Sequence, residues 1–276
     1  MIPTSFQPLG SGLSTSMDYV SSGLRAGHDG YFNGPGKLHS TDTLIWYDWT
    51  GNGNHTLDLV SEGFTGPLDW RLSGLMLQYD YFLRQTVVFP NVWNQLVVSQ
   101  NYTLEVRSRQ LNAYRGWKLS NYWAQGKTPF EWSVGRHLGR LGAITVVIDA
   151  SLTYYLSDSV IETDPEYSQW ENNTFAWSVN NGVYTCYVNG ISVGQLNGGA
   201  PINTTNIGPG SPDFPFSRFT LGSRTMAGAT LDDPNTQTLY DTNAFFQAIR
   251  LYDRPLTQEE LAFNAATDFR RFGANG

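Results

Sequence analysis

Residues 174–196 read TFAWSVNNGVYTCYVNGISVGQL and contain three short runs rich in residues that favour β-strands. Asn189-Gly190 separates the last two runs. Asn-Gly in this position is the strongest short-range signal for a β-hairpin, because a type I′ turn needs a positive φ at both central residues. The sequence therefore predicts that Val188 pairs with Ile191.

Similar runs recur from residue 44 onward, separated by clusters of Gly, Asn, Pro and Asp. In residues 102–107, YTLEVR, apolar and polar residues alternate, which predicts an antiparallel strand with one dry face and one face in solvent. Many short strands of this kind indicate an all-β sandwich or barrel. The expected strands are residues 44–49, 55–60, 75–79, 86–89, 102–107, 143–148, 174–179, 182–188, 191–196, 218–221 and 244–252.

One helix is expected, at the C-terminal end of the chain. Thr257 is its N-cap, and Glu260 completes a capping box. Four apolar residues at helical spacing would face the sandwich. They are Leu261, Ala265, Phe269 and Phe272.

The composition agrees with an all-β fold and excludes some classes of partner. Of the 276 residues, 15% are charged and 14% are aromatic, with 28 Gly and 13 Pro. A net charge of −7 opposes binding to nucleic acid or to an anionic membrane, so we expect neither partner. Cys186 is the single cysteine, which excludes an internal disulfide.

Two parts of the chain are expected to behave differently. Residues 1–20 are mostly Ser, Gly, Pro and Thr with isolated Ile2, Phe6 and Leu9, which predicts an extended N-terminal arm. Residues 21–276 would form one sandwich. We expect the arm to be ordered by another subunit in a homo-oligomer or larger assembly, and a flexible terminus is the alternative.

Three segments resemble the concanavalin A-like lectin/glucanase superfamily, in particular its laminin-G-like jelly-roll modules. The first, residues 23–59, is similar to the family element W-x-D-x-(S/T)-G-N-G-N through residues 46–54. Residues 187–190 match its Y-x-N-G hairpin, and residues 249–264, IRLYDRPLTQEELAFN, resemble its closing strand, turn and helix. The resemblance implies an antiparallel two-sheet jelly roll with one C-terminal helix.

The resemblance also implies a function. Modules of this kind bind glycans or proteins, some with calcium, and versions similar to this one occur in bacteriophages and bacteria. We therefore expect a non-catalytic surface adhesion or decoration module of a bacteriophage virion, which binds a glycan or cell-surface polysaccharide and other virion subunits. The alternatives are an extracellular or cell-surface bacterial lectin-like module that binds carbohydrate, and a glycoside hydrolase.

Aromatic residues gather in residues 108–142, a long stretch without a clear strand pattern. A sugar ring offers an apolar C–H face and hydroxyl groups, so aromatic side chains beside amides and charges suit it. Structural anchoring beneath a long loop is the alternative. The candidate glycan-binding residues are Tyr114, Trp117, Tyr122 and Trp123.

Two motifs have the residue spacing of catalytic sites, but neither lies in the secondary structure that such a site requires. Glu162, Asp164 and Glu166 have the i, i+2, i+4 spacing that aims carboxylates at one cleft in related glucanases. Pro165 and polar neighbours indicate a loop instead. Ser192 lies in a G-x-S-x-G string, but that string opens the second strand of a hairpin rather than a helix. No catalytic residue is expected.

Metal binding has weak support in the sequence. The four histidines, His28, His39, His55 and His137, are scattered, so we expect surface histidines and no zinc site. We expect no cofactor, although calcium is left open because carboxylates could gather at one rim of the sandwich. Those carboxylates are Asp29, Asp42, Asp48 and Asp58.

Overall fold

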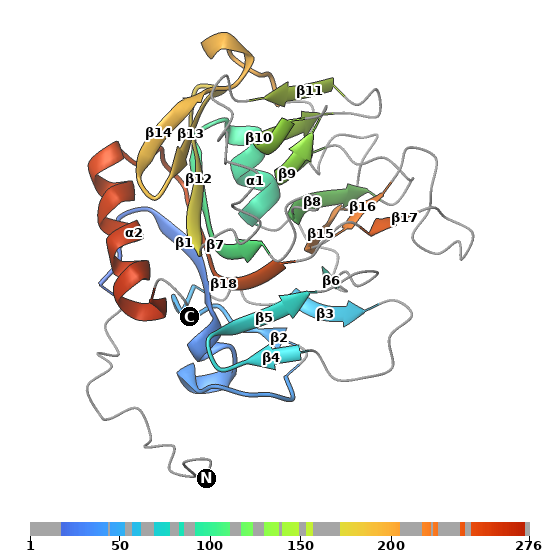
Figure 1. Cartoon of the computed structure of the whole chain (residues 1–276), viewed down its shortest axis with the longest axis vertical. Helices are drawn as coiled ribbons and strands as arrows, with labels where there is room; N and C mark the ends of the chain where they lie inside the picture. Colours follow the sequence, from blue (N-terminus) through green and yellow to red (C-terminus); the bar gives the residue numbers. More distant parts are fainter. Residues whose placement is uncertain are drawn as a thin grey trace.

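The computed structural model confirms the all-β fold, an antiparallel sandwich with a C-terminal helix (Figure 1). The residues that the structure describes are 18–43, 45–52, 57–61, 69–77, 83–85, 92–110, 117–123, 130–137, 140–148, 153–156, 172–204, 217–221, 223–225, 238–240 and 244–273.

Two eight-stranded sheets make up the sandwich in this part of the chain. The first contains β1 (Leu24–Asp29), β4 (Asp69–Arg71), β5 (Gly74–Leu77), β7 (Tyr102–Gln110), β12 (Asn173–Asn180), β13 (Val183–Val188), β14 (Ile191–Gln195) and β18 (Ala244–Tyr252). Its order is β14-β13-β12-β7-β18-β5-β4, and β1 also pairs with β18.

The second sheet contains β2 (Ile45–Trp46), β3 (Leu57–Ser61), β6 (Leu83–Gln85), β8 (Trp117–Trp123), β9 (Phe130–His137), β10 (Arg140–Ile148), β11 (Thr153–Leu156) and β15 (Ser217–Leu221). Its order is β11-β10-β9-β8-β15-β6-β3-β2. A separate two-stranded sheet, β16 (Ser223–Thr225) with β17 (Thr238–Tyr240), lies beside β8.

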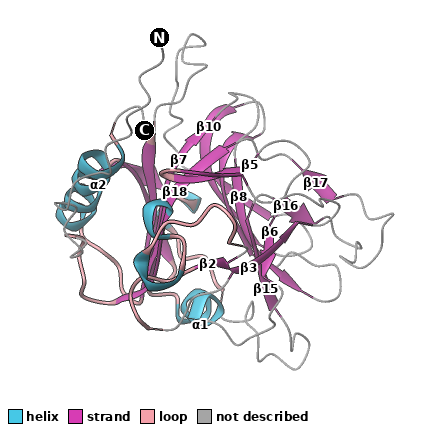
Figure 2. Cartoon of the chain, turned by 90° about the horizontal axis from the view of Figure 1, so that it is seen from below, coloured by secondary structure: helices cyan, strands magenta, loops and turns pink. Residues whose placement is uncertain are grey.

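Helix α2 (Gln258–Phe272) covers the outer face of the first sheet, and the second sheet lies on the other side of the core (Figures 1 and 2). The capping box at its start is confirmed, because Thr257 Oγ1 accepts from the Glu260 backbone and the Glu260 carboxylate accepts from the Thr257 backbone. A second helix, α1 (Val92–Ser99), was not predicted. Among the described residues there are also three short 3-10 helices, Gly30–Phe32, Pro35–Lys37 and Asn197–Gly199.

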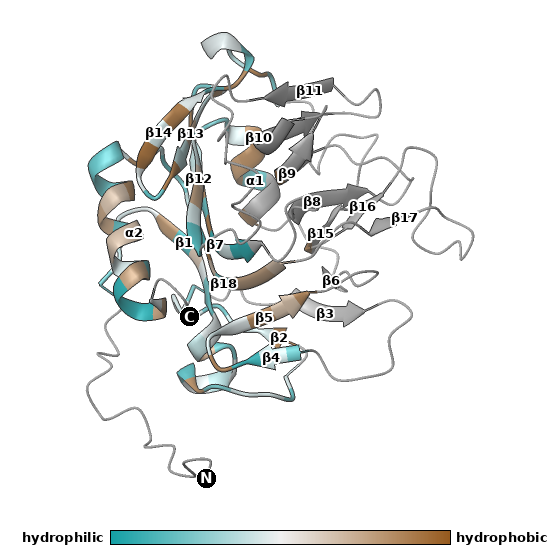
Figure 3. Ribbon diagram, in the orientation of Figure 1, coloured by the Kyte–Doolittle hydropathy of each residue, from teal (hydrophilic) through white to brown (hydrophobic). Residues whose placement is uncertain are grey.

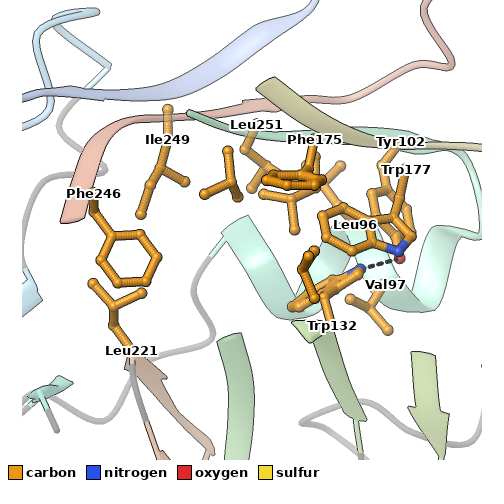
Figure 4. Close-up of a cluster of buried hydrophobic side chains, with 14 of the residues drawn as sticks. Leu96, Val97, Tyr102, Trp132, Phe175, Trp177, Leu221, Phe246, Ile249 and Leu251 are labelled. Carbon is orange, nitrogen blue, oxygen red and sulfur yellow. Dashed lines mark hydrogen bonds between the residues drawn. The ribbon is translucent and has the colours of Figure 1, made fainter. Parts of the chain in front are cut away.

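The core lies between the two sheets (Figure 4). Within it the Tyr102 hydroxyl donates to Tyr184 at 3.1 Å and accepts from Trp132 Nε1 at 3.2 Å. These two hydroxyls and the Trp132 indole are thus paired within an apolar cluster, to which α1 adds Leu96 and Val97. The hydropathy colouring shows much of β18 as hydrophobic, in agreement with its complete burial (Figure 3).

The predicted hairpin is confirmed. Val188 pairs with Ile191, and Asn189 and Gly190 have φ values of 51° and 78°. Both values fall in the left-handed region that the turn requires. The turn packs against α2 at Ala262, so this local signal also helps to place the helix.

The prediction that the polar face of residues 102–107 lies in solvent is wrong. Thr103, Glu105 and Arg107 are 0–1% exposed, because α2 and the segment before it cover this face. Each has a partner there: Thr103 donates to the Arg254 carbonyl, Glu105 pairs with Arg250, and Arg107 donates to the carbonyl of Gly273. The polar face of this strand therefore forms a polar interface with α2 and the segment before it. It does not face solvent.

Other expectations need smaller corrections. Phe269 was placed in the buried stripe of the helix but is 39% exposed, with its ring against the guanidinium of Arg107. The stretch 108–142 was taken as irregular, yet it contains β8 and β9 and the start of β10. The expected strand at residues 86–89 lies outside the described residues.

The predicted boundary of the N-terminal arm at residue 20 is also corrected. Tyr19 is 7% exposed and its hydroxyl donates to Asp268 of α2 at 2.8 Å, while Val20 N donates to Asn264 at 2.9 Å. Residues 18–20 thus belong to the sandwich. The rest of the arm, residues 1–17, lies outside the described residues.

Gly190→Ala is expected to lower the free energy of unfolding by about 2 to 3 kcal/mol, since it combines strain at a positive φ with a new Cβ placed against the backbone of Ala262. Gly198→Ala is the matched control, because Gly198 also has a positive φ but nothing within 4 Å. It should cost about 1 kcal/mol. Urea unfolding measures both, and equal losses would show that the contact between turn and helix contributes nothing.

Candidate functional site

A buried ionic cluster joins α2 to the outer face of the first sheet. Arg250 of β18 lies between two carboxylates: Nε donates to Glu105 Oε2 at 2.9 Å, and both terminal nitrogens donate to Asp268 at 2.7 Å. The three side chains are 0–1% exposed. Charges this deeply buried are tolerated only when they are paired and hydrogen-bonded, as they are here.

Neutral side chains complete the cluster from several elements. Asp268 also accepts from the hydroxyls of Tyr19 and Thr174, at 2.8 and 2.7 Å. Asn264 donates to Glu105 Oε2 at 2.8 Å and to the Tyr252 hydroxyl at 2.9 Å. The contacts link the chain before β1, three strands of the first sheet and α2. We call these seven residues, together with Arg107, the helix clamp.

The pKa values of the two carboxylates in the helix clamp shift in opposite directions. Burial raises the pKa of Glu105, and the positive charge of Arg250 offsets this only in part. Burial acts in the same direction on Asp268, but the charge and hydrogen bonds of Arg250, with the Thr174 hydroxyl, outweigh it and lower the pKa. The Asp268 carboxyl is thus ionised and pairs with the Arg250 guanidinium.

The helix clamp has no geometry for catalysis on a substrate. Glu105 and Asp268 have 0% exposed side chains beneath a helix, so a substrate cannot reach them. A second buried ion pair, between Asp29 and Arg271 at 2.7 Å, lies within one turn of Asp268, in the last turn of α2. Both pairs position the helix.

The carboxylates considered for calcium have other contacts where the structure describes them. Asp29 pairs with Arg271, and Asp48 accepts from Gly27 N and from Thr50. Asp42 is exposed and accepts from a neighbouring hydroxyl. Nothing is described of the Asp58 side chain. Within the described ranges no group of three or more His, Cys, Asp or Glu residues could hold a metal ion, and calcium binding stays a prediction.

The histidines do not all lie at the surface as predicted. His28 is 1% exposed and its Nδ1 lies 2.9 Å from the carbonyl oxygen of Trp46, so it is part of the interior. His39 is half-buried, with Nδ1 3.1 Å from the Gly30 carbonyl oxygen. His55 and the side chain of His137 are outside the described part.

The residues examined for catalysis are only partly described. Glu162, Asp164 and Glu166 lie outside the described residues. Ser192 is in β14, paired with Tyr187 across the hairpin, which is the position that the sequence predicted. It therefore does not stand at a strand-to-helix turn.

The second sheet has two chemically distinct faces. Trp132, Val134 and Leu221 are 0–1% exposed and belong to the core. In a strand, alternate residues belong to opposite faces. The pairing of β8 with β9 and β15 thus places a row of mostly polar residues on the face away from the core. They are Lys118, Ser120, Tyr122, Glu131, Ser133, Arg218 and Thr220. We call this set the outer polar row.

The four predicted glycan-binding residues do not fall on one face of this sheet. Tyr122 pairs with Arg218 in the outer polar row. Trp117 pairs with the buried Val134, and Trp123 is six residues further along β8, at a position of the same parity. Tyr114 lies outside the described residues, as do the side chains of β8. Their contact with a glycan stays a prediction.

A signal for the outer polar row was present in the sequence. Residues 130–134, FEWSV, alternate apolar and polar residues as residues 102–107 do. The prediction that residues 108–142 are irregular overlooked this alternation. Glu131 and Ser133 were therefore not among the candidate surface residues.

Comparison with known proteins supports the fold alone. No protein-family model and no curated protein sequence matches the chain. Trypanosoma rangeli sialidase in complex with sialic acid matches with a TM-score of 0.50 and 13% identity, over 92% of this chain and 34% of the sialidase. A mutant of HCR D/C VPI 5995 matches with a TM-score of 0.53 and 11% identity, over 89% and 52% of the two chains.

Domain 4 of AbnA, a GH43 extracellular arabinanase from Geobacillus stearothermophilus, in complex with arabinotriose, gives a TM-score of 0.47 and 17% identity, over 88% of this chain and 98% of the domain. The chain spans only about a quarter of the NanB chains that it also matches, 27% in one case. Together with the sheet order, the matches with the higher TM-scores support an antiparallel two-sheet β-sandwich of the jelly-roll type.

Asp268→Asn is expected to lower the free energy of unfolding by about 3 to 5 kcal/mol, because it leaves Arg250 underpaired in the interior. Asp253→Asn is the control: its partner Arg25 is 54% exposed, so the loss should stay below about 1 kcal/mol. Denaturant unfolding at neutral pH measures both. A loss below 1 kcal/mol for Asp268→Asn would contradict the role given to the helix clamp.

Proposed function

We propose that the protein is a non-catalytic carbohydrate-binding module whose ligand lies on the outer polar row of the second sheet. One observation carries the proposal: α2 and the helix clamp occupy the outer face of the first sheet, whereas the strand register assigns mostly polar residues to the positions of the second sheet that face away from the core. Of the described helices, none covers that second face.

The chemistry of the outer polar row suits a sugar. Lys118 and Arg218 are donors, Glu131 is an acceptor, and the serines can do both. Tyr122 adds an aromatic ring for the C–H face of a pyranose. A sheet holds such groups at fixed spacings, so the loss of rotational freedom on binding is smaller than in a loop.

Fold likeness gives further support. The T. rangeli sialidase of the comparison was solved in complex with sialic acid. This chain matches only 34% of that protein, so its enzymatic activity is not transferred here. A glycoside hydrolase remains the alternative, and incubation with a bound oligosaccharide, followed by analysis for shorter products, distinguishes the two.

The proposal also covers the biological role of the protein, its location and its partners. The resemblance of residues 46–54 and 249–264 to laminin-G-like modules supports a surface adhesion or decoration role, and a bacteriophage virion as its location. In that setting other virion subunits and further copies of the chain would be partners. A free-standing extracellular or cell-surface lectin-like module uses the same binding face.

Tyr122→Ala is expected to weaken binding by about tenfold or more, because it removes the one aromatic ring of the outer polar row. A glycan array that includes sialylated oligosaccharides identifies the ligand, and calorimetry with that ligand gives the affinity. The thermal unfolding temperature should stay within about 2 °C of the wild type.

Trp117→Ala is the matched control, at a core position of the same strand. It should lower the free energy of unfolding by about 3 kcal/mol while the folded fraction keeps its affinity. Full binding by Tyr122→Ala, or wild-type protein that binds no glycan on the array, would contradict the proposal.

A further inference from the structure

An apolar patch lies on the outer side of α2 and the adjoining hairpin turn. Ile191 is 67% exposed, Phe263 47% and Phe269 39%. Ala262 and Ala266 are also exposed, and the turn before Ile191 packs against Ala262. We call these five residues the α2 patch. A group of exposed apolar side chains on one surface marks an interaction site more often than scattered single residues do.

Packing of the helix does not account for this patch. Leu261, Ala265 and Phe272 already bury the apolar side of α2. Phe263, Ala266 and Phe269 follow at steps of three residues on the solvent side, where Figure 3 shows apolar and polar colours mixed along the helix. The solvent side of the helix thus carries exposed apolar residues, of which Phe269 touches the Arg107 guanidinium and Ala262 borders the hairpin turn.

The N-terminal arm has the composition to cover such a patch. Residues 1–17 contain no Asp, Glu, Lys or Arg, and four of their apolar residues, Ile2, Phe6, Leu9 and Leu13, are spaced three or four positions apart. A segment of this kind has too little apolar surface to fold alone, but it can order on an apolar surface.

The path of the chain directs the arm away from the Ile191 and Phe263 end of its own patch. From Val20 back to Asp18, the contacts move from Asn264 to Asp268 and Thr267, toward the C-terminal end of α2. Ile191 and Phe263 lie nearer its N-terminal end. With ~3.3 Å per residue, residues 1–17 can extend up to ~56 Å, which is enough to reach another molecule.

We propose that the N-terminal arm of one copy docks on the α2 patch of a second copy, and that the exchange is reciprocal. Two copies with one arm and one patch each form a closed pair, in which every apolar patch is covered. The proposal is independent of glycan binding, which uses the opposite side of the sandwich.

Cysteine cross-linking tests the contact directly. Phe6→Cys and Phe263→Cys variants are mixed and oxidised, and we expect a disulfide-linked dimer that contains one copy of each. Cys186 does not compete, because it is fully buried and burial raises the pKa of its thiol. The control pairs Phe6→Cys with Leu72→Cys, since Leu72 is 56% exposed but lies on the β4–β5 turn. It should give no such dimer.

Light scattering after size exclusion provides the second measurement. At ~100 µM the wild type should be a dimer, and both deletion of residues 2–16 and Phe263→Ser should weaken dimerisation about tenfold or more without changing the unfolding temperature. A monomeric wild type would overturn the proposal, as would a deletion variant that still forms the dimer. A cross-link within one chain of a Phe6→Cys/Phe263→Cys double variant, without linked dimers, would overturn it too.

Discussion

The attraction of Arg250 for Glu105 and Asp268 is the interaction on which the arrangement of this protein depends. All three charges are withdrawn from water, so each must find its partner before the helix and sheet can close. That requirement fixes where α2 lies along the strands far more closely than apolar contacts alone would, because a guanidinium and a carboxylate pair well in few geometries. The Tyr19 and Thr174 hydroxyls, which also bind Asp268, extend the same constraint to the chain before β1 and to β12.

This constraint divides the two outer faces of the sandwich between two roles. The outer face of the first sheet is covered by a structural helix. The polar side chains on that face, which a sequence pattern would assign to solvent, are therefore buried. The second sheet keeps its polar positions on the opposite face, where we place the ligand. On its solvent side the helix then carries a surface of its own, the α2 patch. The α2 patch thus follows from where the helix is fixed, and the outer polar row follows from the register of the second sheet.

Local signals in the sequence predicted local structure well. Asn189-Gly190 requires positive φ angles and so specifies its turn without help from the rest of the chain, and Thr257 with Glu260 specifies the start of the helix in the same way. Glu105 could not be predicted correctly from its neighbours, because its partners, Arg250 and Asn264, are more than 140 residues away. The outer polar row could be predicted only in part. The alternation around Glu131 is visible in the sequence, but the strand register that places Tyr122 on the same face is known only from the structure.

Hydrogen exchange measured by mass spectrometry on Arg250→Met tests most directly whether the helix clamp holds α2. Methionine fills a similar volume without the charge, and Arg25→Met, which removes an exposed ion pair, is the control. The account predicts that amides of α2 lose protection in Arg250→Met while the hairpin of β12 and β13 keeps its own, and that the control changes neither. Unchanged protection of α2 in Arg250→Met would contradict it, because the helix would then be held by apolar packing alone.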